Sequence, residues 1–300
     1  MQQIHPGAAA LLVDSRNALG EGATWCDATH TLYWTDIEGA RLWRCRADGS
    51  GLAHWPMPER LACFALTNAP DVLLVGLATH LAFFDLGSGA FTRIVDVEPD
   101  LPTRLNDGRC DPFGAFVFGM KDEGGDPPRA VGGFYRLNAD LTLERLALPP
   151  AAIANSIAFS PDGSKMYFCD SLVREILVCD YRADGDVANV RPFARLTDAD
   201  GDPDGSTMDR DGGLWNAQWG GRRVVRYGPD GVETDRVAVP TAQPSCVALD
   251  GEGRLYVTSA RVGLSDDALA SDADAGGGVF VAQTRRAGLP TARFAGMPAR

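Results

Sequence analysis

The chain has 300 residues, of which 45% are hydrophobic and 23% are charged, so it is long and apolar enough to build a large core. Its formal net charge of -12 argues against nucleic-acid binding, because phosphate recognition requires clustered Lys and Arg side chains. Most of the acidic residues lie in turn sequences such as PDG, RDG and ADG, where Asp makes local backbone hydrogen bonds. The net charge therefore does not imply a cationic partner.

No stretch approaches the ~20 consecutive apolar residues of a membrane span. The N-terminal sequence MQQIHPGAAALLVDSR has no basic leader and only a short apolar run, so it is a poor secretory signal. The seven cysteines include no CxxC pair, and most lie in or beside strand-like runs. We therefore expect buried, reduced thiols and a cytoplasmic protein that binds neither membranes nor nucleic acids.

Six apolar, strand-like runs recur along the chain at intervals of roughly 40 to 50 residues. They are TLYWTDI, DVLLVGL, AFVFGM, KMYFCDS, GLWNAQW and RLYVTSA, marked by Tyr33, Leu74, Val117, Tyr167, Trp215 and Tyr256. Each is followed by a further apolar run that ends at a turn, as in RLWRCRADG and RVVRYGPDG. This period is typical of propeller blades, each a small four-stranded sheet. The sequence therefore predicts an all-β fold, a six-bladed β-propeller that occupies residues 1–300 as a single domain.

Two long polar segments interrupt the strand pattern. MKDEGGDPPRAVGG lies in the third blade, and SDDALASDADAGGG lies in the last. Both are predicted to be loops between strands, and long loops at the rim of a pocket commonly carry functional residues.

A second regularity lies eleven or twelve positions ahead of each strand marker, where a polar or small residue stands. These residues are Glu21, Ala62, Asn106, Asn155, Asp204 and Ser245. Residues at one phase of every blade lie at one height around the axis, so the four polar residues of blades one, three, four and five should converge on one pocket. Carboxylate and amide oxygens suit a hard divalent cation, which predicts a central metal site. Asp162 of SPDG is out of phase and is interpreted as a turn residue.

Four motifs containing these residues resemble the gluconolactonase and senescence-marker-protein (regucalcin-like) family of sugar lactonases. LGEGATW resembles the opening GEGP-W motif, and RLNDG resembles R-x-NDG. IANSIAFSPDG resembles SNG-x-x-x-SPDG, and PDGSTMDRDGGLW resembles PDG-x-x-x-D-x-x-G-x-LW. The motifs occur in the family order and span essentially the whole chain.

The resemblance implies a six-bladed propeller with one divalent metal ion at its axis. It implies that Glu21, Asn155 and Asp204 are the metal ligands, and that Arg104 and Asn106 hold the substrate. It also implies that Asp204 is the general base or orients the attacking water. Ca, Zn, Mn, Mg and Fe(II) all accept oxygen ligands, so the identity of the metal stays open.

These residue types agree with the chemistry of lactone hydrolysis. A sugar lactone is a cyclic ester, and its hydrolysis develops negative charge on the carbonyl oxygen. A metal ion stabilises that charge, a carboxylate accepts the water proton, and Arg104 offers forked donors. With a divalent ion offsetting Glu21 and Asp204, Arg104 leaves the pocket with one net positive charge. The alternative for Arg104 is a salt bridge with a neighbouring acidic residue.

The sequence departs from the family pattern at three places. The third-blade strand ends in Gly119-Met120-Lys121 where the family has G-T-M. We expect the substrate contacts after this strand to differ from the family pattern, with Glu123 or Asp122 in place of its sugar-binding acid. The SNG motif is replaced by Ala154-Asn155-Ser156, which places a hydroxymethyl group beside the metal site. Ala23 replaces the proline of GEGP and is expected to be neutral.

The function that we expect is hydrolysis of a small-molecule sugar lactone to the aldonic acid, with no obligate protein partner. L-arabinono-1,4-lactone is the first candidate substrate, followed by D-galactono-, D-xylono- and D-gluconolactone. Two other classes stay open, a calcium-binding regulatory protein and a propeller that serves as an interaction scaffold. A scaffold does not require four metal-type residues at one blade phase, which counts against it.

Overall fold

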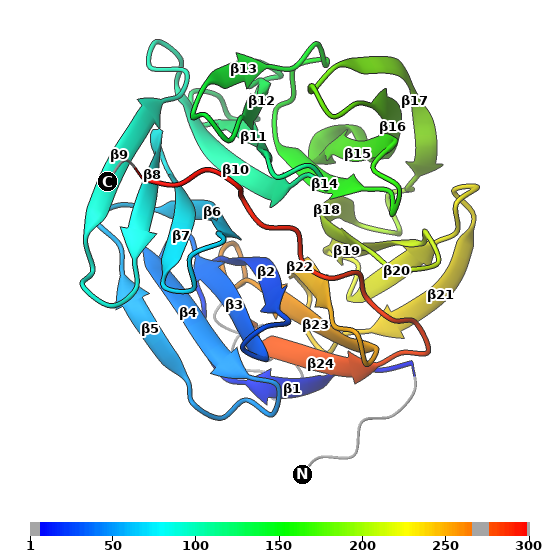
Figure 1. Cartoon of the computed structure of the whole chain (residues 1–300). Coiled ribbons are helices and arrows are strands. Elements are labelled where there is room, and N and C mark those ends of the chain that lie inside the picture. The colour runs from blue at the N-terminus through cyan, green and yellow to red at the C-terminus, as the bar shows by residue number, and fades with distance from the viewer. Residues whose placement is uncertain (1–6, 266–275, 299–300) are drawn as a thin grey trace.

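The computed structural model describes residues 7–265 and 276–298, and most of the predicted SDDALASDADAGGG loop lies outside these ranges. The described residues form six four-stranded antiparallel sheets arranged around a central axis (Figure 1). One short 3-10 helix within these ranges, η1 (Ser171–Val173), follows a strand of the fourth sheet. The predicted six-bladed β-propeller is thus confirmed. No helix in the described ranges is long and apolar enough to cross a membrane.

In each blade, the strands succeed one another outward from the axis. The inner strands are β2 (Gly20–Cys26), β6 (Leu61–Leu66), β10 (Thr103–Cys110), β14 (Ala154–Phe159), β18 (Asp202–Met208) and β22 (Pro244–Leu249). The second strands are β3 (Thr31–Asp36), β7 (Val72–Leu77), β11 (Phe116–Asp122), β15 (Lys165–Asp170), β19 (Leu214–Trp219) and β23 (Arg254–Ser259). All six strand markers lie in the second strands.

The third strands are β4 (Arg41–Arg46), β8 (His80–Asp85), β12 (Phe134–Leu137), β16 (Glu175–Tyr181), β20 (Arg223–Tyr227) and β24 (Val279–Gln283). The outer strands are β5 (Ala53–Pro56), β9 (Phe91–Asp96), β13 (Leu143–Arg145), β17 (Val187–Arg195), β21 (Glu233–Ala238) and β1 (Ala10–Val13). The outer strand of the sixth blade thus comes from the start of the chain. It pairs antiparallel with β24, with Ala10 opposite Val281, so a strand from the start of the chain completes the blade that contains the last strand (Figure 1).

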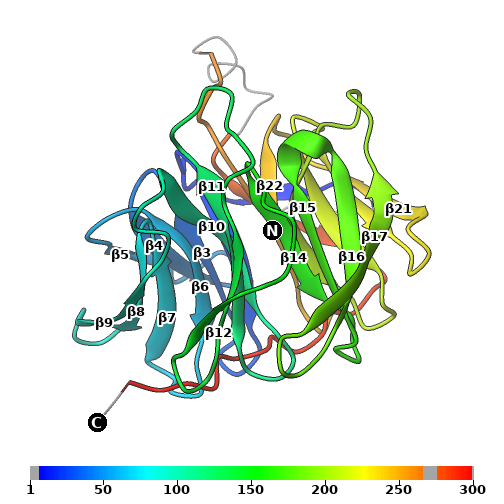
Figure 2. The same ribbon diagram turned by 90° about the horizontal axis from the view of Figure 1, so that it is seen from above.

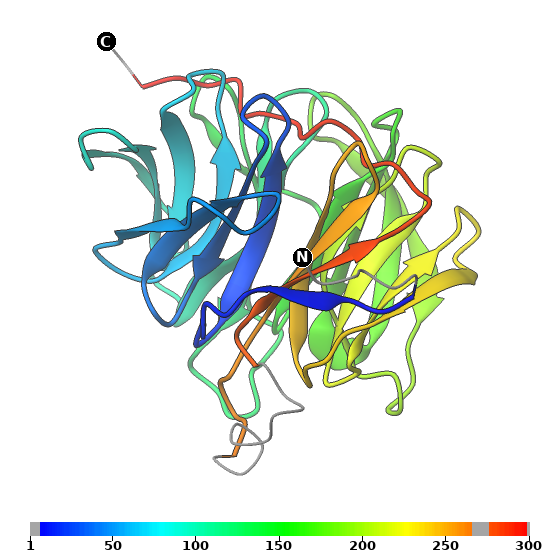
Figure 3. The ribbon, with the colours of Figure 1, turned by 90° about the horizontal axis from the view of Figure 1, so that it is seen from below.

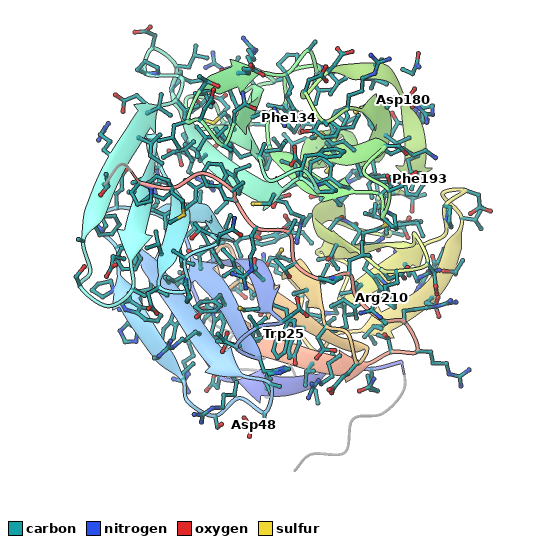
Figure 4. All side chains as sticks on the ribbon, viewed as in Figure 1. Trp25, Asp48, Phe134, Asp180, Phe193 and Arg210 are labelled. Carbon is teal, nitrogen blue, oxygen red and sulfur yellow. The ribbon has the colours of Figure 1, made fainter. Side chains whose placement is uncertain are left out.

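The hydrophobic core is a ring of six clusters, one between each pair of neighbouring blades. Aromatic side chains fill these interfaces. Between blades four and five, Phe193 lies 4.8 Å from Tyr167 and 6.4 Å from Tyr227, measured between ring centroids (Figure 4). All seven cysteines are buried and free, as the sequence predicts. Because each interface involves only adjacent blades, the blades hold one another in register around the axis.

Turn residues at the rim carry much of the acidic charge. Asp48, in the turn after β4, lies at the periphery of the ring (Figure 4). The Asp48 Oδ1 atom accepts hydrogen bonds from the backbone N and the hydroxyl of Ser50 at 3.0 and 2.7 Å, and these bonds hold the pKa of Asp48 below its ordinary value. Asp162 makes the same contacts with Ser164. The interpretation of these acids as local turn residues is therefore confirmed.

The C-terminal segment 284–298 crosses the face where the inner strands end (Figures 1 and 3). Its Phe294 N donates to Leu66 O at 2.8 Å, and its Thr291 N donates to Asp27 Oδ2 at 3.0 Å. A cavity of about 440 Å³ lies beneath it, lined by residues from the ends of the inner strands and from this segment. The loop between β11 and β12 protrudes on the opposite face, where the inner strands begin (Figure 2).

Replacing Phe294 with Ala is expected to lower the free energy of unfolding by about 3 to 5 kcal/mol, because Phe294 is fully buried between blades two and three. Urea denaturation measures this change. Leu52 is 46% exposed, so Leu52→Ala serves as the control and should change stability by less than about 0.5 kcal/mol. Equal effects of the two substitutions would show that the C-terminal segment does not stabilise the ring.

Candidate functional site

The six residues at the common blade phase all lie near the beginnings of the inner strands. Four of them come close together at the axis, namely Glu21 of β2, Asn106 of β10, Asn155 of β14 and Asp204 of β18. The other two serve the packing of the ring. Ala62 is buried in the cluster between blades two and three, and the Ser245 hydroxyl donates to Gly20 O of blade one.

Each inner strand has an irregular register with its neighbour at this height. The shift falls between Glu21 and Thr24 in β2, between Asn155 and Ala158 in β14, and at the equivalent places of the other four inner strands. A bulge bends a strand and changes the direction of its side chains. Gly22 and Ser156, which follow Glu21 and Asn155, both have a φ of 62°. The bulges thus account for polar side chains that leave the sheets and face the axis.

A chain of hydrogen bonds links three blades across the site. Arg104 Nη1 donates to Asn106 Oδ1 at 2.7 Å, and Asn106 Nδ2 donates to Asn155 Oδ1 at 3.0 Å. Asn155 Nδ2 donates to Ser171 Oγ at 2.9 Å, and Ser171 Oγ donates to the main-chain oxygen of Pro203 at 2.8 Å. This chain fixes the Asn155 amide, so its oxygen keeps one lone pair for a further partner.

Two acidic side chains occupy the same site without a close cationic partner. Burial raises the pKa of Glu21 to about 8, and the negative charge of Asp107 adds to the effect. Burial and then the charge of Glu21 raise the pKa of Asp204 well above its ordinary value. Asp204 is 6% exposed, and its Oδ1 atom has no hydrogen-bond partner. Both carboxylates would therefore be stabilised by a cation between them.

The donor set fits a divalent cation. Glu21 and Asp204 offer carboxylate oxygens, the unpartnered Oδ1 among them, and Asn155 offers an amide oxygen. No group of three or more His, Cys, Asp and Glu side chains in the described ranges is placed to hold a metal ion, so the amide is needed to complete the set. Oxygen donors of this kind are the ligands of hard divalent cations.

Glu123 lies at the edge of the site and Asp122 does not. Both carboxylate oxygens of Glu123 accept hydrogen bonds from Arg60, at 2.6 Å each, and Glu123 Oε1 lies 3.3 Å from Arg104 Nε. The Asp122 carboxylate accepts instead from the backbone N atoms of Gly124 and Arg129 and shapes the loop. Of the two acids that the sequence leaves open, Glu123 is the one beside Arg104. For Arg104, the sequence left open either a place beside the substrate or a salt bridge with an acidic residue. The structure shows both a salt bridge to Glu123 and a place at the axis, where Arg104 is only 1% exposed and bonds to Asn106.

The profile of the SMP-30/gluconolactonase/LRE-like region matches residues 19–261. The chain belongs to this family. It is 87% identical over 299 residues to an L-arabinolactonase of Azospirillum brasilense, with 99% of each chain covered. It is 32% identical to a pentonolactonase of Haloferax volcanii, over 94% of this chain and 96% of the other.

Among solved structures, a regucalcin from Agrobacterium tumefaciens, described as a calcium-binding protein, shares 30% sequence identity with a TM-score of 0.89. The match covers 98% of this chain and 99% of that chain. These similarities confirm the predicted membership of the family and its propeller fold. The positions of its motifs in this chain coincide with the beginnings of the inner strands described above.

The motifs of the family did not reveal several residues of the site. Ser171 is the last residue of the KMYFCDS run and joins Asn155 to the strand that carries Asp204. Asp107 and Arg109, which follow Asn106 on the same inner strand, form hydrogen bonds to the inner strands of the fourth and fifth blades. Asp107 Oδ2 accepts from Ile157 N at 2.8 Å, and Arg109 Nη2 donates to Ser206 O at 2.6 Å. RLNDGRCD contains both residues, but only the structure shows the bonds that they make to other blades.

Ser156 is a non-glycine residue in the left-handed region, where the family motif has glycine. Its Oγ donates to the main-chain oxygen of Asp204 at 2.6 Å and accepts from Asn216 Nδ2 at 3.1 Å. The predicted hydroxymethyl group is thus beside the site, and it binds the backbone of a proposed ligand. These hydrogen bonds offset the backbone strain, which for a side chain at this φ is about 1 to 2 kcal/mol.

Ser156→Ala is expected to be less stable than Ser156→Gly by about 1 kcal/mol, because Ala keeps the strained backbone and loses the hydroxyl, whereas Gly relieves the strain. Urea denaturation of the two variants and the wild type at one pH measures the order. A Gly variant that is the less stable of the two would show that the strain is not present.

The raised pKa of Glu21 predicts how stability depends on pH without divalent cations. Between pH 4.5 and about 8, the folded state keeps a proton that the unfolded chain releases, so the contribution of Glu21 to stability is lost as the pH rises through this window. The slope from one such group is at most about 1.4 kcal/mol per pH unit. The Glu21→Gln variant should therefore gain stability over the wild type as the pH increases from 5 to 8.

Urea denaturation in the presence of a chelator, at unit pH steps, measures this difference. Glu144 is exposed, so Glu144→Gln is the control and should run parallel to the wild type. Adding a divalent cation at pH 8 should stabilise the wild type more than Glu21→Gln. A constant difference between Glu21→Gln and wild type across the range contradicts the buried, raised-pKa state of Glu21.

Proposed function

We propose that the protein hydrolyses a sugar lactone to the aldonic acid, with L-arabinono-1,4-lactone as its preferred substrate. The observation that carries this proposal is the buried carboxylate of Asp204, whose Oδ1 is unpartnered, beside Glu21 and the Arg104–Asn106 pair. The 87% identity to an L-arabinolactonase over nearly the full chain supports the substrate. D-galactono-, D-xylono- and D-gluconolactone are the next substrates to test.

Glu21, Asn155 and Asp204 are the residues that we propose to hold one divalent cation, because they supply three oxygen donors from three blades. When bound, the cation would polarise the lactone carbonyl and lower the pKa of water beside it. The similarity to a calcium-binding regucalcin supports a cation in this site, and Ca, Zn, Mn, Mg and Fe(II) are all compatible with oxygen donors.

Arg104 and Asn106 position the substrate in this proposal. Arg104 Nη1 donates to Asn106 Oδ1 and Leu105 O, and Nε lies 3.3 Å from Glu123 Oε1, which leaves the Nη2 N–H groups without an acceptor in the described ranges. They can donate to the carbonyl or hydroxyl oxygens of the lactone. Glu123, held by Arg60, can accept a hydrogen bond from a sugar hydroxyl through its free lone pairs.

Asp204 acts as the general base. Burial raises the pKa of Asp204, and a divalent cation beside it would oppose this effect and keep the carboxylate ionised, so that it can accept a proton from water near neutral pH. One oxygen of this carboxylate would hold the cation, and the other can take a proton from water as the water oxygen bonds to the lactone carbonyl carbon. The ring C–O bond then breaks, and the proton passes from Asp204 to the released ring oxygen, which gives the open aldonic acid. The main chain of Asp204 is held by Ser156 and Asn216, which keeps this carboxylate in place during the reaction.

Asp204→Asn should lower kcat for lactone hydrolysis by a factor of about 10² to 10⁴, the range for loss of a general base. Acid release from the four lactones, with and without a chelator and with each divalent cation added back, is the measurement. The folded state is checked by circular dichroism. Full activity in Asp204→Asn contradicts the role of Asp204, and calcium binding without acid release from any lactone favours a regulatory protein instead.

A further inference from the structure

The chain has only two lysines, Lys121 and Lys165, and 26 of its 28 Lys and Arg residues are arginines. Lys121 stands in the Gly119-Met120-Lys121 segment, where the sequence departs from the family motif. The proposed function gives no role to Lys121 in this segment. Lys121 is half-buried at the end of β11, next to the entry into the fourth blade, where its backbone bridges Ile153.

The register of the third blade places Lys121 beside the site. Lys121 is the direct cross-strand partner of Arg104 in the β10–β11 pair, so the two side chains project from the same face of the sheet. Glu123 follows two residues later, and its Oε1 lies 3.3 Å from Arg104 Nε. Lys121 therefore belongs to the same row of charges as the two residues that we propose to bind the substrate.

The charge of Lys121 acts on both axial carboxylates. It lowers the pKa of Glu21 and that of Asp204, in opposition to their burial. Burial and the charge of Arg104 lower the pKa of Lys121 itself, while the charges of Glu123, Asp204 and Glu38 oppose this shift. No hydrogen bond or ion pair to the Lys121 ammonium group is formed by any residue in the described ranges. A half-buried ammonium with three donors and no protein partner is suited to an anionic ligand.

The charges of the site indicate which ligand this is. A divalent cation would offset Glu21 and Asp204, Arg60 pairs with Glu123, and the charge of Arg109 opposes that of Asp107. Arg104 and Lys121 then leave two positive charges, one more than the sequence predicts from Arg104 alone. The lactone is neutral, whereas the oxygen of the reacting carbonyl group gains negative charge and the aldonate product carries a carboxylate. A second cation therefore favours the charged species over the substrate.

We propose that Lys121 is a further substrate-binding residue, whose ammonium group binds the anionic oxygen that forms during lactone hydrolysis and then the carboxylate of the aldonate. The proposal rests on the function proposed above. It predicts that the protein retains its product more tightly than Arg104 alone would allow, and that loss of Lys121 affects kcat more than the KM of the neutral lactone.

Lys121→Met tests this role, because Met has a similar length and no charge. L-arabinonate binding is measured by calorimetry with saturating Mn²⁺, and lactone kinetics are measured in parallel. We expect the Kd of L-arabinonate to rise at least tenfold and kcat to fall at least tenfold, with a smaller change in KM. Lys121→Arg should keep the affinity within about threefold. Unchanged affinity in Lys121→Met overturns the proposal, and so does a lower Tm without a change in affinity.

The second lysine provides a matched control. Lys165 is also half-buried, but it lies opposite Asp180 at the rim of the fourth blade. Lys165→Met should leave L-arabinonate binding unchanged. Acetylation of the wild-type protein, followed by peptide mass spectrometry, should show that L-arabinonate protects Lys121 and not Lys165. Equal modification of Lys121 with and without L-arabinonate overturns the proposal.

Binding and turnover separate the two proposals. If the wild type hydrolyses L-arabinono-1,4-lactone but L-arabinonate binding does not depend on Lys121, the role of Lys121 is wrong and the lactonase function stands. If no lactone is hydrolysed while L-arabinonate still binds through Lys121, the anion site stands and the proposed activity fails.

Discussion

Carboxylates that are buried together at the propeller axis set the main physical constraint on this structure. Ring closure brings the beginnings of the six inner strands together, so Glu21 and Asp204 act on each other from different blades. Asp107 adds a third buried negative charge beneath them. Burial and mutual repulsion both favour the protonated acids, so ionised carboxylates at this place need nearby positive charge. Arg104, Lys121 and Arg109 are the protein's own contributions, and the proposed divalent cation would complete the compensation.

The geometry that holds these groups is itself strained, and hydrogen bonds from other blades stabilise it. Each inner strand is irregular at the height of the site, and Ser156 adopts a left-handed backbone without being glycine. The Asp204 carbonyl accepts hydrogen bonds from Ser156 and Asn216, and the Pro203 carbonyl accepts one from Ser171. Strain of this kind persists only where the surroundings determine the conformation, and it is common at functional sites. Here the surroundings are the neighbouring blades.

The period of the sequence predicted the blades and the residues at the axis for one reason. Each blade repeats the same path, so a fixed spacing ahead of Tyr33, Tyr167 or Trp215 leads to the same height in the ring. Contacts between blades do not repeat, and the sequence could not show them. Arg60, at the start of the second blade, bonds to Glu123 of the third. Ser171 joins Asn155 to Pro203, and Lys121 of the second strand lies opposite Arg104. Each depends on a partner that stands at no constant distance along the chain.

The period also could not predict how the ring closes, because the closing strand comes from the opposite end of the chain. β1 completes the sixth blade through backbone hydrogen bonds to β24 and apolar contacts, without a covalent link. The order of the blades along the chain can therefore be changed without changing their arrangement in the ring. A circular permutant that joins the present termini through a linker and opens the chain in a rim turn, such as that around Asp48, would keep every contact at the axis. Any of the six blades could close the ring, whereas the residues proposed to bind the metal and the substrate depend only on the ring being closed.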